Sequence, residues 1–244
     1  MLRAVLLLIG AGGVLWSLVG LPSFRLTTPA RAIVARIVVD QRFRPGVLAD
    51  ALSRITAHPV PIIVQPELKQ AEALIRLSKA EDAMLRDSAE QAEQQVKDSE
   101  SSIRASLSAS PSDSFLWLLL YSTSLARRGL DPSQTGFLVQ SYRTGPFEGW
   151  ISLRRNRLAL AAWSALAKAT QDTVVSEFAA LVDSDFIEEA SINLTTAGWS
   201  QRERLAASLA GVDIAVRERL VKRLAVDAVK IKIPGVETDD RPWK

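Results

Sequence analysis

A run of twenty residues at the start of the chain, from Leu2 to Leu21, holds a single charge, that of Arg3, and is followed by Pro22. A helix of this length rises about 30 Å, which matches the hydrocarbon thickness of a bilayer. Proline lacks a backbone N–H and its ring clashes with the preceding turn, so we expect Pro22 to end the helix. The sequence therefore predicts a transmembrane anchor over residues 1–22, which holds the rest of the chain on one side of a membrane.

Two other interpretations of this run remain open. A cleaved secretory signal needs small residues in an A-x-A-like pattern after the apolar run, whereas this run ends in bulky residues from Leu18 to Phe24. A helix that packs one side against a globular core would ordinarily show a polar face to solvent, and none interrupts the run. An uncleaved anchor fits both observations better, with the bilayer as its partner.

The side of the membrane depends on two opposing signals. Arg25, Arg31 and Arg36 follow the run while Arg3 precedes it, and this positive-inside count favours a cytoplasmic body. A short basic start and a long C-terminal domain resemble a secretory layout, and long domains translocate with little regard to charge. We expect a single-pass protein of the bacterial inner membrane with a periplasmic body. The absence of cysteine is compatible with either compartment.

The charge balance argues against one class of partner. The chain has 30 basic and 27 acidic residues, and a net charge of +3. Nucleic-acid binders ordinarily carry a concentrated basic footprint, so we expect no nucleic-acid partner.

Apolar residues at helical spacing predict an all-α body. The expected helices cover 30–43, 47–55, 67 onward, 89–109, 115–128, a short helix to 142, 147–169, 173–182, 201–210 and 213 to about 229. Expected N-terminal caps are Asp172, Asp213 and a Ser200–Glu203 capping box. The expected domains after the anchor are a membrane-proximal helical pair with a Pro-rich connector (23–66), a helical-repeat domain (67–233) and a flexible tail (234–244).

Part of this helical region fits a 34-residue repeat. With a repeat beginning at Ala80, its positions 20, 24, 27 and 32 are Ser99, Ile103, Ser106 and Pro111; the next, from Ser114, has Trp117, Leu120, Tyr121 and Ser124 at positions 4, 7, 8 and 11. Small residues let paired helices approach, while Trp117 and Phe137 fill the gaps. Residues 80–145 thus resemble tetratricopeptide repeats, which implies an α-solenoid. Tyr121 replaces the usual glycine and Gln140 a small residue, and the register is lost beyond Gly145.

A second resemblance concerns the general plan. The chain combines the apolar start with a turn and helix start from Ser110 to Trp117, and with residues 145–150 leading into Arg154 and Arg155. In these features it resembles membrane-anchored helical-repeat proteins of bacterial cell-surface polysaccharide systems. That resemblance implies a part in polysaccharide assembly or export.

The sequence carries no recognisable catalytic, metal or nucleotide motif. His58 is the only histidine, there is no cysteine, and neither a G-x-S-x-G elbow nor a Gly-rich phosphate loop occurs. The acidic cluster of Asp183, Asp185, Glu188 and Glu189 lacks the EF-hand spacing and fits a solvated helix start. We expect no enzymatic activity, no cofactor and no metal.

One stripe is a candidate for partner binding. Trp150, Arg154, Arg157 and Ala161 recur at i, i+4, i+7 and i+11, which places them on one face of a helix, with Arg143 and Arg155 adding charge nearby. An aromatic ring with guanidinium groups suits a protein surface or an anionic glycan or lipid. In the alternative, Trp150 belongs to the core and the arginines form a solvated edge over it.

These observations predict a non-enzymatic, membrane-anchored scaffold that binds a protein partner in a membrane complex. The alternative is a structural accessory subunit of an integral membrane complex, held mainly through its transmembrane helix.

Overall fold

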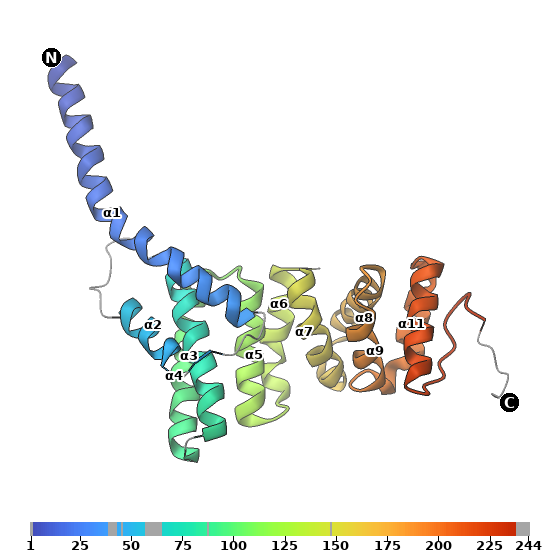
Figure 1. Cartoon of the computed structure of the whole chain (residues 1–244). Coiled ribbons are helices and arrows are strands. Elements are labelled where there is room, and N and C mark those ends of the chain that lie inside the picture. Colours follow the sequence, from blue (N-terminus) through green and yellow to red (C-terminus); the bar gives the residue numbers. More distant parts are fainter. Residues whose placement is uncertain are drawn as a thin grey trace. The chain divides into compact units, whose positions relative to one another are not determined.

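The computed structural model describes residues 2–38, 43–44, 46–56, 65–86, 88–146 and 148–237. Two compact units divide the chain, a first unit of residues 1–112 and a second unit of residues 113–244. All regular structure in the described residues is helical, as predicted (Figure 1). The boundary expected at 66/67 falls inside the first unit, where helices on both sides of residue 66 pack together.

The described part of the first unit contains four α-helices: α1 (Leu2–Val38), α2 (Val47–Thr56), α3 (Pro66–Arg86) and α4 (Ala89–Ala109). Ala30 of α1 packs against Leu68 and Ala71 of α3. A neighbouring cluster joins Leu48 and Ala51 of α2 to Ile75 of α3.

Helix α1 does not end at Pro22, which corrects the prediction, but continues through it and through Pro29 to Val38. A proline inside a helix removes one hydrogen bond and bends the axis without necessarily ending the helix. Figure 1 shows such a bend in α1. Among the described residues, no helix combines the length and the apolar character that crossing a membrane requires.

Helix α4 agrees closely with its sequence pattern. Its expected apolar residues, Ala92, Val96, Ile103 and Leu107, are all buried. Ser88 caps the helix, because its hydroxyl accepts from the Gln91 N–H while the Gln91 side chain accepts from the Ser88 N–H. His58 and most of the Pro-rich connector lie in residues 57–64, outside the described residues.

The second unit contains seven α-helices in its described part: α5 (Ser114–Arg128), α6 (Thr135–Thr144), α7 (Gly149–Ala161), α8 (Lys168–Asp183), α9 (Ile187–Thr195), α10 (Arg202–Ser208) and α11 (Ile214–Val226). Short 3₁₀ turns occupy Pro132–Gln134, Trp163–Ala165, Trp199–Gln201 and Leu209–Gly211. Trp117 of α5 stacks on Phe137 of α6 with ring centroids 6.1 Å apart. Both rings are half-buried, so the pair fills the gap between the helices without being enclosed.

The single long helix expected over 147–169 is wrong, because the chain breaks after Ala161 and α8 starts only at Lys168. The break has no glycine or proline. It is stabilised by Gln171, whose side-chain amide donates to the backbone oxygens of Trp163 and Leu166, each at 3.1 Å. The guanidinium of Arg204 also lies over the Trp163 ring.

The expected caps had different outcomes. Asp213 caps α11 by accepting from the Ala215 N–H at 2.8 Å, which confirms that prediction. Asp172 lies inside α8 and pairs with Arg204. No side chain caps α10, so the Ser200–Glu203 box is absent; a 3₁₀ turn precedes the helix instead.

The first residue of the predicted tail, Pro234, contacts the second unit, because the Arg217 guanidinium donates to its backbone oxygen. Ile233, just before the tail, is buried. Residues 238–244 lie outside the described part of the chain.

Candidate functional site

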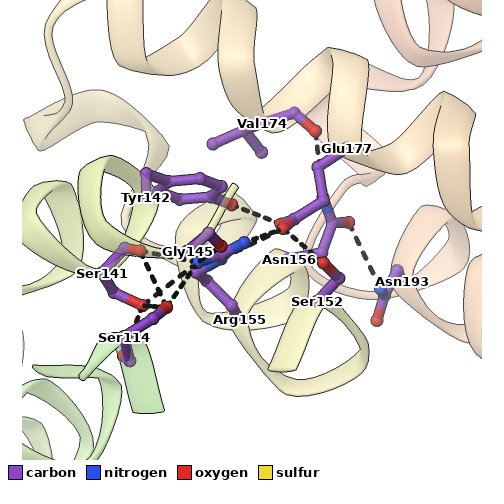
Figure 2. Close-up of polar contacts among 10 residues, drawn as sticks. All are labelled: Ser114, Ser141, Tyr142, Gly145, Ser152, Arg155, Asn156, Val174, Glu177 and Asn193. Atoms are coloured by element: carbon purple, nitrogen blue, oxygen red, sulfur yellow. Dashed lines mark hydrogen bonds and ion pairs between the residues drawn. The ribbon is translucent and has the colours of Figure 1, made fainter. Parts of the chain in front are cut away.

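A buried ion pair joins Arg155 and Glu177 in the second unit (Figure 2). Helix α7 supplies the arginine and α8 the carboxylate, and their side chains are 0% and 1% exposed. The Arg155 Nη2 and Nε atoms both donate to Glu177 Oε1, at 2.6 and 3.0 Å. Charged hydrogen bonds of this kind are short and strong, and they compensate in part for removing both charges from water.

The opposite side of the Arg155 guanidinium group contacts α5 and α6. Arg155 Nη1 lies 2.8 Å from the Ser141 backbone oxygen and 3.0 Å from that of Gly145. The Ser114 hydroxyl lies 3.1 Å from the same nitrogen, and it also donates to the Ser141 backbone oxygen at 2.9 Å. The Arg155 guanidinium group therefore links α5, α6, α7 and α8, because its N–H donors point in several directions.

Two hydroxyl groups complete the surroundings of Glu177. Tyr142 donates to Oε2 and Ser152 donates to Oε1, both at 2.7 Å. Burial, and next the negative charge of Glu177, raise the pKa of the Tyr142 phenol well above its ordinary value of 10.0. The phenol therefore stays protonated and donates to the carboxylate. The Arg155 guanidinium carbon also lies 4.2 Å from the centre of the Tyr142 ring.

A second buried contact extends this arrangement to α9. The Asn156 side chain donates to the Val174 backbone oxygen at 2.9 Å and accepts from Asn193 at 3.3 Å. Asn156 and Asn193 are 0% and 2% exposed. Neighbouring residues of α7 thus fix the positions of α5, α6, α8 and α9.

Gly145 provides the space that this cluster needs. A Cβ atom on Gly145 would lie 2.5 Å from the Ser114 Cβ and 2.8 Å from the Ser114 Oγ. Only glycine lets the chain after α6 pass this close to α5 while its carbonyl faces Arg155.

The geometry of this buried network assigns it a structural task. The network, defined as Ser114, Ser141, Tyr142, Gly145, Ser152, Arg155 and Glu177, is enclosed in the second unit, and both charges have partners (Figure 2). Its side chains face one another, so the arrangement sets helix positions and supplies no group to a substrate from solvent.

The burial of Arg155 was not predicted. The sequence pattern indicated that Arg155 adds charge beside the stripe of Trp150, Arg154 and Arg157. A local signal was available at its partner. Val174, Glu177, Phe178 and Leu181 follow helical spacing and are all buried, so Glu177 is a charged residue on an apolar face. Such a residue needs a partner from another element.

The expected partner-binding stripe occupies α7, on which Arg155 itself is buried. Trp150 is 45% exposed and its ring packs on Phe115 with centroids 4.6 Å apart. Arg154 is half-buried and Arg157 is exposed. The stripe therefore presents one indole edge and one guanidinium to solvent.

The acidic cluster has ion-pair partners on α11. Asp185 pairs with Arg219 at 2.9 Å, and Glu188 pairs with Arg223 at 2.5 Å. Within the described part of the chain, no group of three or more potential ligands is placed to hold a metal ion.

Comparison with protein-family models, curated proteins and solved structures finds no match to this chain.

Proposed function

We propose that this protein is a non-enzymatic, membrane-anchored scaffold that mediates protein–protein interactions. The observation that carries the proposal is the apolar start of α1, where the described part of the chain leaves large side chains uncovered. Val5, Leu6, Ile9, Val14, Leu15 and Trp16 are 51% to 69% exposed. Exposed apolar surface of this extent is typical of membrane or protein contacts.

In this proposal, residues 2–21 insert into the bacterial inner membrane and the two helical units stand on its periplasmic side. Within each unit the helices form tetratricopeptide-like pairs; the proposal is supported by the buried small residues Ser99 and Ser106 in the first unit and by the stacked Trp117 and Phe137 in the second. The resemblance to polysaccharide-system proteins gives the process, namely cell-surface polysaccharide assembly or export.

The anchoring proposal is tested by placing charge in the apolar run. Ile9→Lys combined with Val14→Lys should shift the chain from the membrane fraction to the soluble fraction, because lysine at the centre of a span strongly opposes insertion. Carbonate extraction of cell membranes measures this distribution. Val226→Lys is the matched control, since Val226 is 79% exposed in the second unit. A double lysine variant that resists extraction as wild type does would contradict the proposed anchor.

We propose that Trp150, Arg154 and Arg157 form the partner-contacting surface. Trp and Arg are enriched among residues that dominate binding energy. The exposed edge of Trp150 and the exposed charge of Arg157 are both available on α7.

Arg157→Glu should leave the unfolding temperature nearly unchanged, because the side chain is exposed, and should reduce the amount of partner recovered with the chain from membranes. Recovery is measured by affinity purification and mass spectrometry. Lys222→Glu makes the same charge change at an exposed position of α11 and should recover the partner normally. Full recovery by Arg157→Glu, but loss upon removal of residues 2–21, would favour the accessory subunit held through its anchor.

A further inference from the structure

A groove of about 310 Å³ lies between α1 and α2 in the first unit. Its apolar lining comes from Pro29, Ala30 and Ile33 of α1 and from Val47, Ala51 and Ile55 of α2; Asp50 and Arg54 add charge to its wall. This volume is at the lower end of the range for ligand pockets. A helix about 10 Å wide does not fit it, whereas a hydrocarbon chain does.

The groove lies close to the proposed membrane surface. Pro29 is eight residues beyond Leu21 on the same helix, which corresponds to about 12 Å along the axis. The headgroup layer on each side of a bilayer is about 5–8 Å deep. The groove therefore opens next to the layer that holds lipid headgroups.

The stretch of chain that supplies the groove has a net positive charge larger than that of the whole chain. Residues 22–56 contain six arginines and two aspartates, a net charge of +4, whereas the whole chain carries +3. Arg31, Arg36, Arg44 and Arg54 are exposed. Basic residues clustered just beyond a membrane span attract anionic lipids, each contributing about 1 kcal/mol near the surface.

We propose that this groove and its arginines bind an anionic phospholipid, with an acyl chain between α1 and α2 and the headgroup phosphate against the guanidinium groups. The inference rests on the membrane anchoring proposed above. An apolar groove and a net positive charge in the same 35-residue stretch match the two chemical parts of one lipid molecule. Binding of such a lipid holds α2 at the membrane surface and so fixes how the first unit leaves the bilayer.

The test uses the full chain in a mild detergent with equal amounts of phosphatidylglycerol and phosphatidylcholine, and native mass spectrometry to count the lipids retained. Wild type should retain phosphatidylglycerol in preference. Arg54→Gln and Arg44→Gln should each reduce that retention about fivefold, which corresponds to the roughly 1 kcal/mol per basic residue. Arg128→Gln, the same change in the second unit, should have no effect.

A second variant tests the groove itself. Val47 is partly exposed at the groove, so Val47→Trp fills the space without opening the core, and retention of phosphatidylglycerol should fall. Circular dichroism confirms that the variant is folded. Equal retention of the two lipids by wild type, or unchanged retention in Arg54→Gln or in a folded Val47→Trp, would overturn the inference. Lipid preference in detergent does not depend on insertion, so its failure is distinguishable from failure of the anchor in carbonate extraction.

Discussion

Replacing Arg155 by methionine should lower the free energy of unfolding by about 3–5 kcal/mol, the usual cost of breaking a buried ion pair. The substitution leaves Glu177, whose side chain is 1% exposed, with two hydroxyl donors and no cation. It also leaves the backbone oxygens of Ser141 and Gly145 without their guanidinium donor. Both effects act on the folded state, because water solvates the same groups in the unfolded chain.

Urea unfolding of the full chain in a mild detergent measures this loss. Of the six tryptophans only Trp16 lies in the first unit, so tryptophan fluorescence mainly reports unfolding of the second unit. Arg157→Met is the matched control on the same helix, and it should change stability little because Arg157 is exposed.

A double-mutant cycle separates the ion pair from packing. Arg155→Met combined with Glu177→Met should recover a substantial part of the loss, since a paired replacement leaves no uncompensated charge. If Arg155→Met unfolded at the urea concentration of Arg157→Met, the buried network would not hold these helices together.

Gly145→Ala should be the second most damaging of these substitutions to stability, by about 1–3 kcal/mol, the usual cost of overpacking. The added methyl group would meet the Ser114 Cβ at 2.5 Å, so α5 and the end of α6 must separate. That movement also displaces the Ser114 hydroxyl from Arg155.

Gly149→Ala provides the control, because nothing lies within 4 Å of a Cβ at that position. Alanine at the start of α7 should be neutral or stabilising by less than about 1 kcal/mol, since glycine loses more backbone freedom on folding. The same urea experiment measures both variants. Equal stability of Gly145→Ala and Gly149→Ala would show that α5 and α6 are not packed as closely as the distances indicate.

Helix content and several helix boundaries were predictable because their causes are local. The apolar spacing in residues 89–109 identified every buried residue expected on α4, and Asp213 marked the start of α11. Both signals act within one or two turns of the chain, so a linear sequence contains all the information they need.

Other features depended on partners distant in the sequence. The break between α7 and α8 has no glycine or proline; Gln171 of α8 contacts it from a few residues away, and Arg204 of α10 contacts it from a distant part of the chain. The local pattern therefore predicted a continuous helix. Pro22 shows the opposite case, in which a residue that ordinarily ends a helix is accommodated within α1.

The buried network shows most clearly what the tertiary structure decided. By itself, the sequence determined that Arg155 and Glu177 belong to helices. Which arginine of α7 is buried was decided by the approach of α5, α6 and α8, which brings carbonyl groups, hydroxyl groups and one carboxylate around residue 155. A charge is stable away from water only where such partners converge, and they come from residues 10 to 41 positions away along the chain.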